Sequence, residues 1–191
     1  MESNNTVIEF TKFSNVTIIA GDYQFKCDGH TLGTNFKYFE TILEKQENGN
    51  PIELNDDEKI LEKVLRFTYS NGMMSLTELF FGDREFDILT LFDKYMYVNF
   101  KDMVEFCMKK KVHTQQESKI PLSYLIQKTD EKTIKKLSDL LFFTTVDKPN
   151  MATIKEFIAH DKTDSLLKRF VTLSKQYVQL TRIEKSNKNG R

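Results

Sequence analysis

The stretch that decides the fold is residues 16–27, VTIIAGDYQFKC. Its first five residues are mostly β-branched, and its last five alternate between apolar and polar side chains, and both patterns favour strands. Gly21-Asp22 between them is a typical turn pair. The stretch therefore predicts a β-hairpin with strands over 16–20 and 23–27.

The residues that follow change to a helical period. Between Asn35 and Lys45, apolar side chains at positions 36, 39, 42 and 43 predict one face of a helix. Residues 46–51, QENGNP, are typical of a loop. The next three residues, IEL at 52–54, predict a short strand.

Three more helices are expected before residue 112. Residues 55–58, NDDE, combine short capping side chains with acids that favour the positive helix end, so a helix is predicted to start there. Asn71-Gly72 predicts its left-handed stop. Residues 85–97 predict another helix, with Ile88, Leu89, Phe92 and Met96 facing inward. The third helix starts near Phe100 and closes on three lysines at 109–111.

The rest of the chain predicts helices separated from the first part by a polar linker at 114–118. Helices are expected near 120–128, 131–143, 151–160 and 164–183. Residues 184–191 are polar and predict a frayed tail.

Composition excludes several classes of function. The chain has 191 residues, 16 Phe and a net charge of zero. A neutral chain lacks the basic surface on which nucleic-acid and anionic-membrane binding depend. Cys27 and Cys107 lie far apart without metal-ligand spacing, which favours buried, reduced thiols and a cytoplasmic or nuclear location. No secretion signal or long apolar run is found, so no membrane role is expected.

No motif predicts catalysis. His30, His113 and His160 are scattered, and none is close in sequence to a Cys or an acid at ligand spacing. The acids at 56–58 are better explained as helix-start residues than as a metal or acid–base cluster. Serine lacks nucleophile-elbow glycines, and no glycine-rich phosphate loop exists. We therefore expect no enzyme activity, no catalytic residues, no cofactor and no metal site.

The order of these segments resembles the BTB/POZ domain, a module that joins proteins to one another. The similarity runs over residues 14–111 and includes the stretch from Phe25 to the aromatic pair Tyr38-Phe39, with Leu32 in the buried-leucine place. It continues in VLRFTY at 64–69 and in Asp93-Lys94-Tyr95. The resemblance implies an α+β fold in which a small β-sheet is flanked by a helical stack.

The same resemblance implies a domain organisation. Residues 1–13 would be a short N-terminal segment, 14–111 the BTB/POZ-like domain, and 119–183 an all-helical extension of the kind that follows the domain in many adaptors (BACK-like). Residues 184–191 would be the tail. This expectation for residues 119–183 rests only on their position after the domain, because they contain no matching motif.

By this resemblance the chain is expected to be a substrate adaptor for a cullin-based ubiquitin ligase, holding a cullin and a target protein. The helix around 38–45 resembles the docking segment, in which an apolar residue stands two positions before a glutamate, although it lies earlier than in the family. The residues expected to bind a partner are Tyr38, Ile42, Leu43, Glu44 and Tyr69.

Two departures from the family narrow this expectation. The positions that line a charged, corepressor-binding groove in its zinc-finger branch hold Asn15, Asp28 and Gly29 here, so that use is not expected. The segment before residue 14 would span only about 20 Å as a helix. The family's swapped-helix dimer is therefore not the expected form, and the sequence leaves open a monomer or a shortened or differently built dimer interface, for which the candidate residues are Val7, Ile8, Phe10 and Phe13.

Other functions remain open from the sequence. A structural homo-oligomer without any ligase link would use the same fold. The Skp-type adaptors of F-box ligases share the core, and PIEL at 51–54 and ILEKVL at 60–65 resemble them. The potassium-channel tetramerisation branch is a weaker resemblance.

Overall fold

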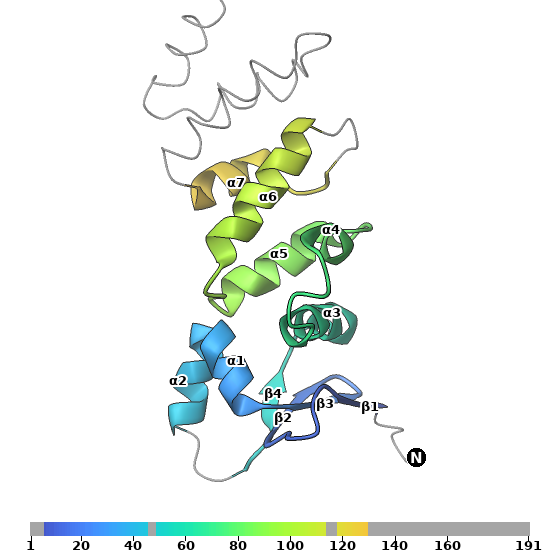
Figure 1. Cartoon of the computed structure of the whole chain (residues 1–191), viewed down its shortest axis with the longest axis vertical. Helices are drawn as coiled ribbons and strands as arrows, with labels where there is room; N and C mark the ends of the chain where they lie inside the picture. The colour runs from blue at the N-terminus through green and yellow to red at the C-terminus, as the bar shows by residue number, and fades with distance from the viewer. Residues whose placement is uncertain (1–5, 46–48, 114–117, 130–191) are drawn as a thin grey trace, which may run out of the picture. The chain divides into compact units, whose positions relative to one another are not determined.

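The computed structural model describes residues 6–45, 49–113 and 118–129. The chain divides into two compact units, residues 1–106 and 107–191. The first unit is an α+β domain that holds a four-stranded mixed sheet and most of the described helices (Figure 1). Within the described residues, no helix is long and apolar enough to cross a membrane.

The sheet has the strand order β1-β3-β2-β4. Strands β2 (Val16–Ala20) and β3 (Tyr23–Cys27) form the antiparallel hairpin that the sequence predicts, and β4 (Ile52–Leu54) pairs parallel to β2. The bounds of all three strands agree with the prediction. Strand β1 (Thr6–Glu9) pairs parallel to β3 and was not expected.

One face of the sheet forms the base of the core. A single row across the four strands joins Ile8, Phe25, Ile18 and Ile52, because these residues are direct partners in the three ladders. Phe25 and Ile18 are fully buried. Figure 1 shows helices α1 (Gly29–Asn35), α2 (Lys37–Lys45) and α3 (Glu58–Tyr69) on one side of the sheet.

The helix expected over 35–45 is helix α2, and a further helix, α1, precedes it. Helix α1 starts after Asp28, whose carboxylate accepts a hydrogen bond from the Thr31 N–H at 2.8 Å and so caps the helix. Phe36 then adopts an extended backbone (φ −133°, ψ 116°) and pairs with Tyr97 in an isolated β-bridge. Because Phe36 interrupts the helical backbone, α2 starts at Lys37.

Helix α3 starts and ends as predicted. Asp57 accepts hydrogen bonds from the N–H groups of Lys59 and Ile60 at 3.1 and 3.0 Å. Beyond its last turn, Asn71 and Gly72 both have positive φ, 51° and 82°, which is the predicted left-handed stop. The short helix α4 (Leu76–Leu79) follows and was missed, although Ser75 and Glu78 form a capping box at its start.

Helix α5 (Glu85–Lys94) is shorter than the 85–97 predicted. The expectation that Met96 faces inward was wrong: its φ is 53° and its side chain is 51% exposed. The left-handed residue ends the helix and turns the chain toward helix α6 (Phe100–His113). Ile88, Leu89 and Phe92 are buried, as expected.

Helix α7 (Leu122–Lys128) agrees with the helix expected near 120–128. The expected helices at 131–143, 151–160 and 164–183, and the tail at 184–191, lie outside the described residues.

Candidate protein-interaction surface

Helix α2 is held in place by the turn that follows α5. The first backbone N–H groups of a helix have no partner within the helix. Here the Lys37 N–H donates to the Met96 carbonyl at 3.2 Å, and the Tyr38 N–H donates to the Tyr95 carbonyl at 3.4 Å. The Tyr38 and Tyr95 rings also pack together, with centroids 5.0 Å apart. The start of α2 therefore has a defined position in the fold.

The outward side of α2 is a stripe of mixed polarity, which we call the α2 outer stripe. With 3.6 residues per turn, Tyr38, Thr41, Ile42 and Lys45 lie on one side of the helix. Tyr38 and Ile42 are half-buried, and Thr41 and Lys45 are exposed. The stripe therefore combines two partly accessible apolar side chains with polar ones, as many protein interfaces do.

The structure does not bring the predicted Ile42-Leu43-Glu44 triplet to one surface. Successive helical residues point about 100° apart. Leu43 lies on the same side of α2 as Phe39, which is fully buried, and Glu44 is exposed away from both. Of the five residues predicted to bind a partner, only Tyr38 and Ile42 share the α2 outer stripe.

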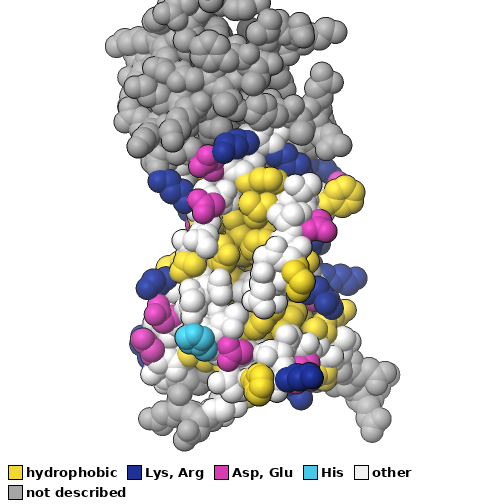
Figure 2. Space-filling view, in the orientation of Figure 1, with side chains coloured by type: hydrophobic (Ala, Val, Ile, Leu, Met, Phe, Trp, Pro, Cys, Tyr) yellow, Lys and Arg dark blue, Asp and Glu magenta, His cyan; other side chains and the backbone are white. Residues whose placement is uncertain are grey.

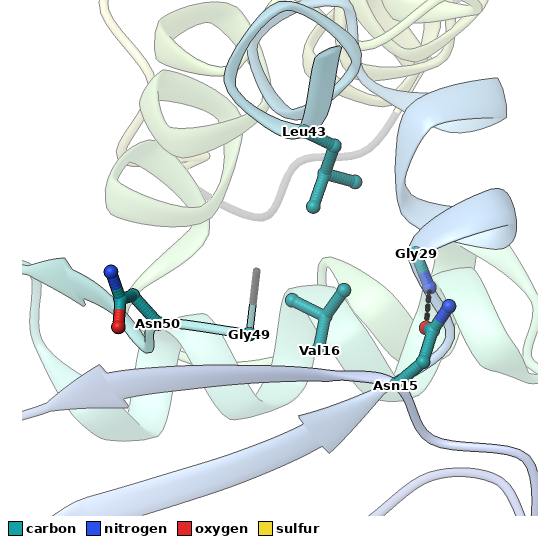
Figure 3. Close-up of a pocket in the computed structure, with 6 residues that line it drawn as sticks. All are labelled: Asn15, Val16, Gly29, Leu43, Gly49 and Asn50. Carbon is teal, nitrogen blue, oxygen red and sulfur yellow. Dashed lines mark hydrogen bonds between the residues drawn. The ribbon is translucent and has the colours of Figure 1, made fainter. Parts of the chain in front are cut away.

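Leu43 instead points into a small open pocket of about 300 Å³ between the start of β2 and the last turn of α2 (Figure 3). Among the described residues, its lining consists of Asn15, Val16, Gly29, Leu43, Gly49 and Asn50. None of these side chains is charged. The described part of the lining therefore suits an uncharged group.

The base of the pocket depends on Gly29. The Asn15 side-chain oxygen accepts a hydrogen bond from the Gly29 N–H at 2.7 Å (Figure 3). A Cβ atom at Gly29 would lie 2.9 Å from Cγ2 of Val16. The sequence pointed to Asn15 and Gly29 only as positions that lack the charged groove residues of the family. It did not predict the pocket, because no local pattern shows that β2 and α2 meet here.

The Asp28 carboxylate beside this pocket is engaged in the helix cap. Its Oδ2 atom accepts from both the N–H and the hydroxyl of Thr31, at 2.8 and 2.7 Å. These bonds stabilise the ionised form and hold the pKa of Asp28 below its ordinary value. Asp28 therefore acts as an N-cap residue.

Tyr69, predicted to meet a partner, has its hydroxyl turned inward. It accepts a hydrogen bond from the Asp28 N–H at 3.0 Å and donates one to the Asp28 carbonyl at 2.8 Å. Its ring stacks on Phe10, with centroids 5.2 Å apart. Burial raises the pKa of the Tyr69 hydroxyl. Tyr69 thus connects the end of α3 to the β3–α1 junction.

The residues predicted to form a dimer interface do not form a helix, and a dimer through them stays a prediction. Val7 and Ile8 lie in strand β1, because the chain finds a parallel partner in β3. Val7 is 53% exposed and Phe13 is 83% exposed. Phe10 is half-buried against Phe25 and Tyr69. The apolar side chains of this segment are therefore divided between the core and the surface.

In the view of Figure 2, acidic and basic side chains are interspersed, with groups of hydrophobic side chains between them. Within the described ranges, no three His, Cys, Asp or Glu side chains are placed to hold a metal ion. Cys27 and Cys107 are buried, and neither forms a disulfide. Of the histidines, His30 is exposed on α1, and His160 lies outside the described residues.

Comparison with known proteins gave no relative: no family model matches this chain, and no curated protein matches it.

Proposed function

We propose that the chain is a non-enzymatic protein–protein interaction module with a BTB/POZ-like core. The observation that carries this proposal is the order of elements in the first unit. A β2–β3 hairpin is followed by the α1–α2 pair, then by β4 parallel to β2, and then by α3 and α5. This is the order that the resemblance of residues 14–111 implies.

The proposed role is that of an adaptor that presents a target protein to a cullin-based ubiquitin ligase. The α2 outer stripe is the proposed docking surface, and Tyr38 and Ile42 are its apolar contacts. Both side chains are partly accessible, and the backbone bonds from Lys37 and Tyr38 to the α5–α6 turn give the stripe a fixed position. A prepositioned surface loses less conformational entropy on binding.

The test is light scattering of the full chain with and without a cullin N-terminal domain. Ile42→Arg should abolish the complex, because it places a charge at the centre of the stripe. Lys59→Ala, at an exposed position on α3, is the matched control and should bind like the wild type. Unchanged binding by Ile42→Arg would reject this docking surface, and no complex with the wild type would reject the cullin role.

Leu43→Arg is a poorer probe of docking. Leu43 Cδ1 would lie 3.4 Å from a Cβ at Gly29, so the side chain packs where α2 meets α1. Its substitution would disturb that packing, so a loss of the cullin complex could come from a loss of folding and would not locate the docking surface. Glu44→Ala leaves the packing intact because Glu44 is exposed. If the cullin instead uses the triplet at 42–44, Glu44→Ala should weaken the complex.

The alternative is a homo-oligomer without a ligase link, and the exposed strand β1 is the observation that favours it. An oligomer of this kind would show a concentration-dependent mass and no cullin complex. The Skp-type reading shares the core and predicts, in addition, binding of an F-box segment.

A further inference from the structure

Strand β1 forms one edge of the described sheet. The strand order β1-β3-β2-β4 places β1 and β4 at the two edges. Strand β4 has three residues and follows Pro51, and short strands and proline both discourage further pairing. Strand β1 has four residues, TVIE, without Pro or Lys. Among the described residues, no strand pairs with its outer side.

The backbone groups on that outer side belong to Val7 and Glu9. The Thr6 N–H donates to the Asp22 carbonyl at 2.8 Å, and the Phe10 N–H donates to the Lys26 carbonyl at 3.1 Å. In a parallel ladder, alternate residues of a strand bond to the same neighbour. Thr6, Ile8 and Phe10 therefore face β3, and Val7 and Glu9 direct N–H and C=O groups outward.

We propose that this edge pairs antiparallel with β1 of a second copy of the chain, about a two-fold axis at Ile8. Val7 of each copy would then lie opposite Glu9 of the other and exchange two hydrogen bonds with it. Ile8 would lie opposite its own copy as a non-hydrogen-bonded pair, in which side chains approach most closely. The two four-stranded sheets would become one sheet of eight strands.

The apolar row of the sheet argues for a second copy as the occupant. Ile8 is the outermost member of the row that continues through Phe25, Ile18 and Ile52. It is only half-buried, whereas Phe25 and Ile18 are fully buried. Pairing about Ile8 would continue the row into the identical row of the second copy. It would cover Ile8 with an apolar side chain of the same shape.

The charges are compatible with this register. Glu9 is the only charged residue of β1, and a two-fold axis at Ile8 keeps the two Glu9 side chains from facing each other directly. Lys26 is the direct partner of Glu9 in β3, and the Ser14 hydroxyl donates to the Glu9 carboxylate at 3.2 Å. Both contacts moderate the negative charge near the axis.

Oxidative cross-linking of the full-length protein tests the register. Ile8→Cys should form a disulfide-linked dimer, because position 8 meets its own copy on the axis. Val7→Cys is the matched control, and it should cross-link at least tenfold more slowly, because position 7 lies opposite position 9. Equal rates for the two variants, or no cross-linked product from either, would overturn the pairing.

A pair of charge variants tests the same register without a new thiol. Val7 is exposed, so Val7→Lys and Val7→Glu should leave the monomer equally folded. In the dimer, Lys at position 7 would lie opposite Glu9, and Glu would meet a like charge. Sedimentation equilibrium should show dimers of Val7→Lys about fivefold tighter than the wild type and dimers of Val7→Glu about fivefold weaker. Equal effects would overturn the proposal.

The substitution Val7→Pro tests whether the dimer depends on the outer edge of β1 and not on the pairing of β1 with β3. It removes an N–H that points away from β3, so the β1–β3 ladder should persist while the dimer is lost. A wild-type chain that stays monomeric at all concentrations would overturn the proposal. The partner of the β1 edge would then be a strand of another protein. The dimer does not depend on the α2 outer stripe, so Ile42→Arg should leave its mass unchanged.

Discussion

The Tyr69 hydroxyl spans the β3–α1 junction by bonding to both backbone groups of Asp28, accepting from its N–H at 3.0 Å and donating to its carbonyl at 2.8 Å. The two residues are 41 positions apart in the chain. Asp28 also caps α1, so the end of α3, the end of β3 and the start of α1 meet at one point. The α1–α2 pair, which carries the proposed docking surface, begins there.

Tyr69→Phe should therefore lower the free energy of unfolding by about 1–2 kcal/mol, because it leaves the Asp28 N–H without its acceptor. The Phe ring keeps the stacking on Phe10. Urea unfolding followed by circular dichroism measures the change. Tyr23→Phe, which removes a hydroxyl from a ring that packs on Phe25, is the control and should change stability by about 0.5 kcal/mol or less. Equal losses would contradict the role given to Tyr69.

The two glycines of α1 should respond to alanine with opposite signs. At Gly29 a Cβ would lie 2.9 Å from Val16 and 3.3 Å from the Asn15 side-chain oxygen, so Gly29→Ala should cost about 1–3 kcal/mol. At Gly33 the nearest atom, Cα of Glu40, lies at an ordinary 3.5 Å. Gly33→Ala should therefore stabilise the fold by about 0.5–1 kcal/mol through helix propensity.

Thermal unfolding of both variants checks the prediction. No loss for Gly29→Ala would contradict the close packing of β2 against the start of α1, and a loss for Gly33→Ala would contradict the ordinary spacing between Gly33 and Glu40.

The strands that the sequence predicted share a property: their side chains alternate or are β-branched within one short segment, so the pattern is local. Strand β1 is also rich in β-branched residues, Thr6, Val7 and Ile8, but it is only four residues long, and its parallel pairing with β3 is a contact that no local pattern shows. Helix α1 contains two glycines, which disfavour helix. It exists because Asp28 caps it, and Tyr69 fixes Asp28.

The candidate surface was predictable only in part. The helical period correctly identified α2, and its outward side includes Tyr38 and Ile42. Neighbours in sequence were assumed to act together, but a helix sends Leu43 and Glu44 in different directions. The inward position of Tyr69 depends on a contact across 41 residues, which no local pattern encodes.

The cap of α3 should make stability depend on pH in the acid range. The Ile60 N–H bond, together with the contact to Arg84, holds the pKa of Asp57 below its ordinary value. A carboxylate with a lowered folded pKa contributes stability above its unfolded pKa, about 3.9, and loses that contribution as pH falls through the folded pKa. Asp57→Asn should therefore destabilise the protein more at pH 7 than at pH 3.

Urea unfolding at the two pH values measures this difference. Asp57→Ala, which also removes the cap itself, should cost about 1 kcal/mol at pH 7. A destabilisation by Asp57→Asn that is the same at both pH values would show that the charge of Asp57 contributes nothing.

The Cys27 thiol should be unreactive in the folded protein. Burial raises its pKa from 9.0 to about 12, so the neutral thiol is the form the fold favours. This contribution to stability is present below pH 9 and is lost as pH rises toward 12. At pH 8, iodoacetamide should modify Cys27 at least a hundredfold more slowly than in urea, because the thiolate is the reactive form. Mass spectrometry of the Cys107→Ser variant isolates Cys27, and rapid modification without denaturant would place this thiol at the surface.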